Sequence, residues 1–141
     1  GTFGYELDLN HLTEQEQEEV KHQIAFMKEY REVLQFGTFY RLSSPFEGNI
    51  TCWMAVSENK TQAIVGWYRV LCGVNLPYTR IRLQGLDPEL CYRNQETGQS
   101  YYGDELMNLG LITSDALSGQ VEDPNADYGD FDSTLSIFKA I

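Results

Sequence analysis

The sequence predicts a mainly β fold, an antiparallel sandwich or barrel, preceded by one strand and one long helix. Two observations predict it. Apolar residues recur with a helical period between residues 13 and 37. Beyond residue 37 the period changes to the alternation of strands, and turn-forming residues become frequent. Many short strands joined by regular turns are typical of antiparallel sandwiches and barrels.

The first predicted element is a strand over residues 1–9. Phe3, Tyr5, Leu7 and Leu9 alternate there with small or acidic residues. A single strand cannot form a sheet. We therefore expect this strand to need neighbours that the chain does not supply.

A long predicted helix begins after Thr13 and ends at Gly37. Thr13 and Glu16 have the spacing of a capping box. The helix carries a stripe of apolar side chains: Val20, Ile24, Met27 and Leu34, widened by Phe26, Tyr30 and Val33. Burying four such side chains is worth on the order of 6–12 kcal/mol. We therefore expect the stripe to pack on the β-domain, on a second copy, or on two domains at once.

Predicted strands cover residues 39–42, 50–57, 62–70, 80–83, 90–94 and 131–141, whereas residues 101–111 fit more than one structure. The second and third strands flank a four-residue turn and predict a hairpin with Ser57 opposite Gln62. In that register six side chains share the core face: Cys52, Met54, Val56, Ala63, Val65 and Trp67. Trp53 then lies opposite Gly66 on the other face, where its ring covers the exposed glycine backbone.

Composition excludes several kinds of partner. The 141 residues carry a formal net charge of −11, which argues against binding to nucleic acid or to an anionic membrane. No apolar run approaches the roughly 18–20 residues of a membrane span. Cys52, Cys72 and Cys91 are odd in number and have apolar or strand-like surroundings. They fit reduced thiols in a cytoplasmic protein better than a disulfide framework.

Several separated blocks carry a family resemblance, and they occur in this order: FGYELDL, IAFMKEYREVLQFGTFYRLSSP, WMAVSENKTQAIVGWYRVL, RIRLQGLDPELCYR and YYGDELMNLGL. This order resembles the C-terminal region of glycoside hydrolase family 36, the bacterial α-galactosidases. The resemblance covers nearly the whole chain and weakens over about residues 113–130. It implies that residues 1–38 are the terminal strand and helix of a catalytic (β/α)8 barrel. Residues 39–141 would then be the C-terminal antiparallel β-sandwich.

The resemblance implies a parent enzyme that hydrolyses terminal α-galactose from melibiose or raffinose-type sugars with retention. Its two carboxylates would stand about 5–5.5 Å apart. Glu6 and Asp8 share one face of a strand and could approach that separation, but the family's catalytic carboxylates lie on earlier barrel strands. We therefore expect no catalytic, substrate-binding or metal-binding residue in this chain, and no cofactor. Its expected partners are the remainder of the parent enzyme and a second copy in a homo-oligomer.

Other chemical candidates fail on spacing. His11 and His22 are the only histidines, and the cysteines form no CxxC element, so the pattern does not favour a structural zinc site. Residues 123–130 resemble the start of a calcium loop. The glycine falls one place late, however, and Thr134 occupies the position that needs a bidentate Glu. This segment fits a solvated acidic loop better.

The alternative function is an autonomous carbohydrate-binding module. Seven aromatic residues could stack on sugar rings: Trp53, Trp67, Tyr68, Tyr78, Tyr92, Tyr101 and Tyr102. We predict that Trp67 is a core residue, and that Trp53 is exposed or covers a domain interface. An exposed coplanar pair among these rings would favour the module.

Overall fold

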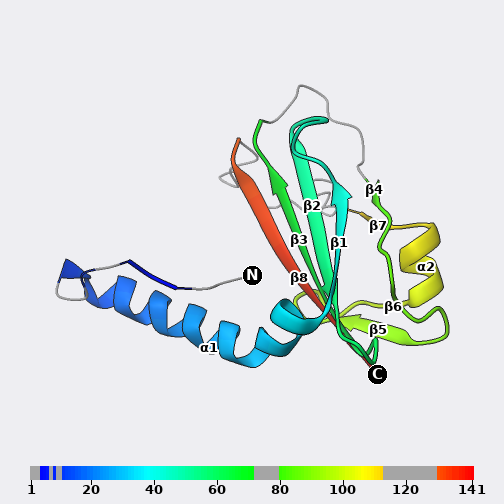
Figure 1. The fold of residues 1–141 in the computed structure, drawn as a ribbon, viewed down its shortest axis with the longest axis horizontal. Helices are drawn as coiled ribbons and strands as arrows, with labels where there is room; N and C mark the ends of the chain where they lie inside the picture. The colour runs from blue at the N-terminus through cyan, green and yellow to red at the C-terminus, as the bar shows by residue number, and fades with distance from the viewer. Residues whose placement is uncertain (1–3, 7, 9–10, 72–79, 113–129) are drawn as a thin grey trace.

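The computed structural model confirms the predicted antiparallel β-sandwich preceded by one long helix (Figure 1). It describes residues 4–6, 8, 11–71, 80–112 and 130–141. The helices are α1 (Glu14–Phe36) and α2 (Gly103–Asn108). The strands are β1 (Thr38–Ser43), β2 (Ile50–Val56), β3 (Gln62–Arg69), β4 (Arg80–Ile81), β5 (Cys91–Asn94), β6 (Ser100–Tyr102), β7 (Leu111–Ile112) and β8 (Asp132–Ala140).

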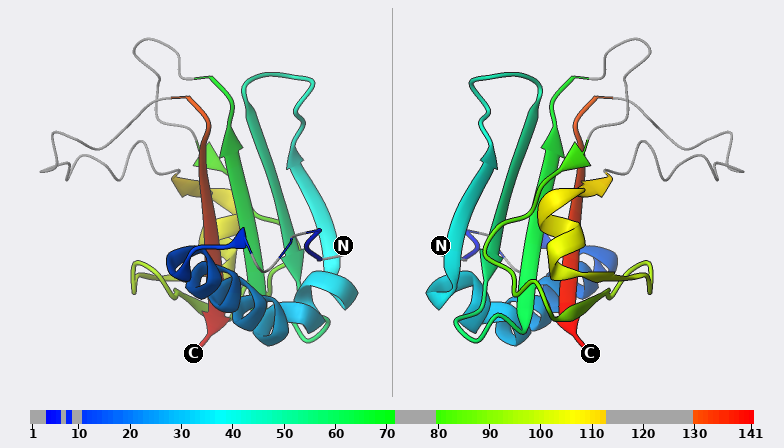
Figure 2. Two further views of the ribbon diagram at one scale, coloured as in Figure 1. Left: turned by 90° about the vertical axis from the view of Figure 1, so that its left-hand side faces the viewer. Right: turned by 90° about the vertical axis from the view of Figure 1, so that its right-hand side faces the viewer.

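The large sheet has the order β1-β2-β3-β8-β5-β6, and every pair in it is antiparallel. A two-stranded sheet of β4 and β7 lies with α2 on one face of it, and the C-terminal half of α1 lies on the other (Figures 1 and 2). The fold therefore has a core side, closed within the chain, and a helix side.

Helix α1 begins and ends where the sequence predicts. The Thr13 hydroxyl accepts a hydrogen bond from the backbone N–H of Glu16, and the Glu16 carboxylate accepts one from the backbone N–H of Thr13 at 2.8 Å. This capping box satisfies two donors at the helix start. Gly37 ends the helix with a φ of −66°. A β-carbon there would lie 2.4 Å from the Val33 carbonyl oxygen and 2.6 Å from that of Val56. Close approach of the helix end to β2 therefore requires this glycine.

The β2–β3 hairpin has the predicted register. Ser57 donates its backbone N–H to the Gln62 carbonyl, and Trp53 lies opposite Gly66. All six predicted core-face residues of the hairpin are buried: Cys52, Met54, Val56, Ala63, Val65 and Trp67. The alternation of the two strands thus separates the core side from the helix side.

The core side is closed by residues from the small sheet, α2 and the connecting turns. Ile81, Leu83, Leu86 and Leu106 pack against the hairpin, together with Tyr92 and Phe138. The Tyr92 ring is fully buried, and its hydroxyl donates to the Lys60 carbonyl and accepts from the Asp87 N–H. Burial is the main cause that raises the pKa of Tyr92. The hydroxyl of this side chain is thus satisfied, and it links two connecting segments to the core.

The structure corrects one sequence-based expectation and specifies two others. Residues 4–6 and 8 of the predicted first strand form no strand, since no described strand lies beside them to pair with. Residues 101–111, which fitted several structures, contain the end of β6, then α2, then the start of β7. The predicted last strand is present as β8, and it lies between β3 and β5 in the sheet, a position that the sequence did not specify.

Candidate functional site: the helix-side face of the sheet

The helix-side face consists of the side chains that alternate with the core residues of the large sheet. Register places Ala55, Ile64 and Ile137 in one row across β2, β3 and β8, and Trp53, Gly66 and Leu135 in the next. Ala55 and Ile64 of the first row belong to the buried cluster beneath α1. Trp53 and Leu135 of the second row pack against that cluster.

Only the C-terminal half of α1 is seated on this face. Tyr30 and Val33, which are 6% and 4% exposed, form a buried cluster with Ala55 and Ile64. Phe26 and Leu34 pack at the margin of the cluster. The predicted packing of the helix stripe on the sandwich is therefore confirmed for its C-terminal part.

An ion pair closes the edge of this seat. Lys139 on β8 donates to the Glu29 carboxylate at 3.0 Å, and its ammonium lies 5.1 Å from the centre of the Tyr30 ring. The hydrogen bond from Lys139 lowers the pKa of the Glu29 carboxyl, and the same bond raises the pKa of the Lys139 ammonium. The pair thus links α1 to β8, the strand whose central position in the sheet the sequence did not predict.

The N-terminal half of α1 extends past the sheet (Figure 1). Val20, Ile24 and Met27 are half-buried, and they belong to neither buried cluster of the described residues. Residues 4–6 and 8 run beside this half, where the Tyr5 hydroxyl donates to the Gln23 side chain. The apolar stripe therefore continues beyond the sandwich that covers its other end.

Three aromatic rings, which we call the aromatic row, cross β1, β2 and β3 on the same face. The Phe39 and Trp53 ring centres lie 5.7 Å apart at an angle of 24°, and those of Trp53 and Tyr68 lie 6.5 Å apart at 26°. Phe39 is 55% exposed and Tyr68 is 39% exposed. Trp53 covers Gly66, as the sequence predicts, and connects the row to the cluster beneath α1. The row is thus an exposed aromatic surface that borders a buried one.

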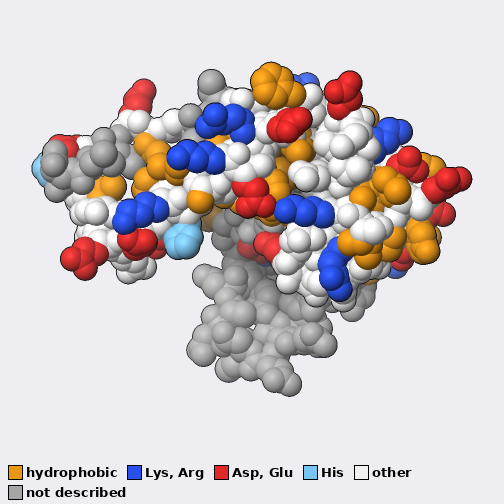
Figure 3. Space-filling model, turned by 90° about the horizontal axis from the view of Figure 1, so that it is seen from below, with side chains coloured by type: hydrophobic (Ala, Val, Ile, Leu, Met, Phe, Trp, Pro, Cys, Tyr) orange, Lys and Arg blue, Asp and Glu red, His pale blue; other side chains and the backbone are white. Residues whose placement is uncertain are grey.

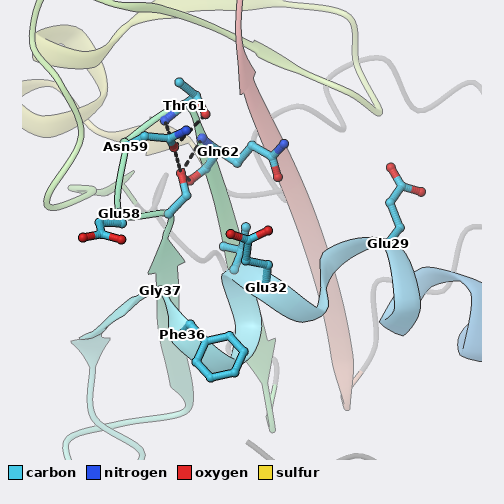
Figure 4. Close-up of a pocket in the computed structure, with 10 residues that line it drawn as sticks. Glu29, Glu32, Phe36, Gly37, Glu58, Asn59, Thr61 and Gln62 are labelled. Atoms are coloured by element: carbon cyan, nitrogen blue, oxygen red, sulfur yellow. Dashed lines mark hydrogen bonds between the residues drawn. The ribbon is translucent and has the colours of Figure 1, made fainter.

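A cavity of about 380 Å³ lies where the end of α1 meets the β2–β3 turn (Figure 4). Its acidic side chains are Glu29, Glu32 and Glu58. The Asn59 side-chain oxygen accepts hydrogen bonds from the hydroxyls of Ser57 and Thr61 at 2.8 Å, which fixes the turn. Within the described part of the chain, no three His, Cys, Asp or Glu side chains are grouped to hold a metal ion. The hydrogen bonds of Asn59 in this cavity therefore stabilise the β2–β3 turn.

The side chains considered for chemistry are not assembled into a site. Glu6 and Asp8 are exposed, and the Asp8 carboxylate lies 3.8 Å from His11. His22 is exposed on α1. The expectation that the chain holds no catalytic, substrate-binding or metal residue stays a prediction.

The cysteines and the acidic loop are described only in part. Cys52 is a free, buried thiol, and burial raises its pKa to about 12. Cys91 is also free and is half-buried. Cys72 lies outside the described residues, as does the calcium-like segment except for Asp130.

Sequence reasoning missed a buried charge. Arg69, at the end of β3, is 2% exposed, and it lies 3.4 Å from the Asp132 carboxylate on β8. Its guanidinium carbon lies 5.5 Å from the centre of the Trp67 ring. The signal in the sequence was a lone Arg at the end of a run of apolar strand residues. Its partner, Asp132, lies 63 residues further along the chain, so spacing could not identify the pair.

The described helices include none that is both long enough and apolar enough to cross a membrane.

Two family models match the chain: the glycosyl hydrolase family 36 C-terminal domain over residues 50–138, and melibiase over residues 1–37. The division of the chain at residue 38 stays a prediction.

Similar proteins are α-galactosidases. The chain is 50% identical over 111 residues to α-galactosidase AgaA of Geobacillus stearothermophilus, covering 79% of the chain and 15% of that protein. It is 40% identical over all 141 residues to an α-galactosidase of Lactobacillus acidophilus, covering 18% of it. The crystal structure of α-galactosidase AgaB from G. stearothermophilus superposes with a TM-score of 0.84 and 45% identity, over 99% of this chain and 18% of that one. The chain therefore spans less than a fifth of the length of these relatives. The matching family model and the similarity of the sandwich and helix to these structures show that the chain belongs to glycosyl hydrolase family 36 as a C-terminal domain.

Proposed function

We propose that this chain is the non-catalytic C-terminal part of an α-galactosidase, and that it holds the last helix of the catalytic barrel on the sandwich. The observation that carries the proposal is the seating of α1. Tyr30 and Val33 are buried against Ala55 and Ile64, while the N-terminal half of the same helix extends away from the sheet. A helix shared in this way joins two domains rigidly, because each domain buries a different part of it.

The parent's chemistry, in this proposal, is retaining hydrolysis of terminal α-galactose by two carboxylates that precede residue 1. Crystal structures of AgaA variants in complex with raffinose and with stachyose support the class of substrate.

Hydrolysis of p-nitrophenyl α-galactoside tests this function. We expect no turnover by the 141-residue chain, and turnover by the longer polypeptide encoded by the same reading frame. The substitutions Glu6→Gln and Asp8→Asn, made in the longer polypeptide, separate two readings of these acids. Turnover that remains in both variants of the longer polypeptide supports the proposal. Loss of that turnover in either variant, or turnover by the unchanged 141-residue chain, contradicts it.

Two expectations about the whole protein remain predictions. Light scattering on the purified longer polypeptide would show the predicted homo-oligomer as a mass that is a multiple of its chain mass. Cell fractionation with an antibody would test the predicted cytoplasmic location.

A further inference from the structure

We propose that the chain carries a sugar-binding site away from the helix-side face, in a hollow beside the loop that joins β1 to β2. Its ligand is a neutral saccharide, which it binds without chemical change. The choice among saccharides rests on the proposed function, which makes a galactoside such as raffinose the sugar that this protein meets.

The hollow lies at the upper end of the large sheet, where the β1–β2 loop meets the end of β3 (Figures 1 and 2). Its volume is about 420 Å³. Two of its lining residues, Ile50 and Arg69, lie opposite each other in register, and Ile50 packs against the core cluster. The hollow therefore belongs to the core side, at the end of the sheet away from the seat of α1.

Hydrogen bonds fix the backbone of the loop beside the hollow. The backbone N–H of Glu47 donates to the Ser44 carbonyl at 3.2 Å, and the N–H of Val70, just after β3, donates to the Asn49 carbonyl at 2.9 Å. Glu47 and Asn49 both line the hollow. Their side chains thus extend from a backbone that needs little further ordering when a ligand binds.

Polar groups on this loop are available to a ligand. The side chains of Glu47 and Asn49 are exposed, and within the described part of the chain neither has a hydrogen-bond or ion-pair partner. A carboxylate accepts hydrogen bonds, and an amide both donates and accepts them. The two side chains therefore match neighbouring sugar hydroxyls, which also donate and accept.

Apolar side chains supply the other half of a sugar site. Ile50 and Leu71 line the hollow. Phe46, next to Glu47 on the loop, is 95% exposed, so its ring has little contact with the rest of the protein. A pyranose has C–H groups on its faces and hydroxyls at its rim. An exposed aromatic ring beside hydrogen-bonding side chains therefore fits its chemistry.

A small anion is the competing ligand, because Arg69 lines the hollow. The Arg69 guanidinium lies 3.4 Å from the Asp132 carboxylate, however, so its charge is paired. Glu47 adds negative charge to the lining, and the chain has a formal net charge of −11. These charges repel an anion and favour a neutral ligand.

The lower end of the molecule provides a control residue. From below, Lys, Arg, Asp and Glu side chains cover much of the surface around α1, with smaller hydrophobic areas between them (Figure 3). Phe36, at the end of α1, is 80% exposed. It precedes β1 whereas Phe46 follows it, so the two exposed rings lie at opposite ends of that strand.

Titration of the isotope-labelled 141-residue chain with raffinose, followed by NMR, tests the site. Trp67 and Trp53 are the two tryptophans of the chain, and each gives its own indole signal. The Arg69 guanidinium lies over the Trp67 ring, whereas Trp53 lies on the helix-side face. We expect saturable shifts of the Asn49 amide and the Trp67 indole, with a Kd on the order of 1 mM. The Trp53 indole should not shift.

Substitutions on the loop give a second measurement. Phe46→Ala should raise the Kd for raffinose about fivefold through lost stacking. Asn49→Ala should raise it by about the same factor through a lost hydrogen bond. Phe36→Ala should leave the Kd unchanged. Because both loop side chains are exposed, neither loop variant should change the melting temperature.

Three results would overturn the proposal. The first is no saturable shift with raffinose, and saturable shifts with sodium sulfate in its place would identify an anion site. The second is a shift of the Trp53 indole without one of Trp67, which puts the sugar on the helix-side face. The third is an equal Kd for Phe46→Ala, Asn49→Ala and the unchanged chain. An inactive longer polypeptide would contradict the proposed function but leave this titration valid.

Discussion

Trp53 lies across Gly66 so closely that a β-carbon on residue 66 would stand 2.6 Å from the Trp53 Cε2 atom. The two residues face each other across β2 and β3. A glycine in a strand normally weakens it. Here the glycine lets an indole ring lie against the backbone, which places the middle ring of the aromatic row.

The substitution Gly66→Ala should therefore destabilise the fold by about 1–3 kcal/mol, the usual cost of overpacking. Urea denaturation of the 141-residue chain measures it. Gly48→Ala is the matched control, because a β-carbon on Gly48 meets nothing within 4 Å. The double variant Gly66→Ala, Trp53→Ala should cost less than the sum of its single changes. Equal unfolding free energies for Gly66→Ala and Gly48→Ala would show that the contact with Trp53 has no energetic consequence.

Truncation of two valines on α1 to alanine should change the free energy of unfolding by different amounts. Val33→Ala removes buried methyl groups from the helix seat and should cost about 2 kcal/mol in the unfolding of the 141-residue chain. Val20→Ala, in the half that extends past the sheet, should change that stability by less than about 0.5 kcal/mol. In the longer polypeptide, whose barrel we propose to cover Val20, the control should become destabilising as well. A Val20→Ala effect as large as that of Val33→Ala in the 141-residue chain would mean that this half is already packed.

The Glu29–Lys139 pair should make the helix seat depend on pH. Its hydrogen bond lowers the pKa of Glu29 in the folded state, so this contribution is complete above the ordinary Glu pKa and is lost as pH falls through the lowered value. The pKa of Lys139 is raised, so its contribution is complete below the ordinary Lys pKa and is lost as pH rises through the raised value. Hydrogen exchange of α1 amides against pH measures both limits. The variant Glu29→Gln should remove them, and an unchanged pH profile in that variant would argue against the pair.

The Cys52 thiol should be inert in the folded protein. Its pKa of about 12 and its burial keep the reactive thiolate scarce and inaccessible. In a Cys72→Ser background, we expect a thiol reagent at pH 8 to modify the half-buried Cys91 first, and Cys52 only on unfolding. Equal rates for the two thiols in native buffer would contradict the predicted packing of Cys52.

Local signals predicted the parts of the fold whose partners are near in sequence. The capping box of Thr13 and the hairpin register at Trp53 and Gly66 each depend on contacts within a few turns or one hairpin. The position of β8 does not, because its pairing with β3 joins segments about seventy residues apart, such as Gly66 and Leu135. The elements β6, α2 and β7 were not identified, since two to six residues carry too little periodicity to distinguish a helix from a strand.

The candidate site was likewise predictable only where it depends on contacts near in the sequence. The alternation of β2 placed Trp53 on the face away from the core, and the helix stripe indicated that a second surface was needed. The joining of Phe39, Trp53 and Tyr68 into one row depends on the pairing of three strands, and the Arg69–Asp132 pair depends on β8. Neither follows from spacing along the chain.

The most direct measurement is complementation between two separately purified polypeptides: the 141-residue chain, and the part of the longer polypeptide that precedes residue 1. Hydrolysis of p-nitrophenyl α-galactoside is followed for each alone and for the mixture. We predict no turnover by the 141-residue chain, little by the preceding part, and turnover in the mixture that Val33→Ala weakens. Turnover by the 141-residue chain alone, or full turnover by the preceding part without it, would contradict the claim that this chain completes the catalytic barrel without contributing chemistry.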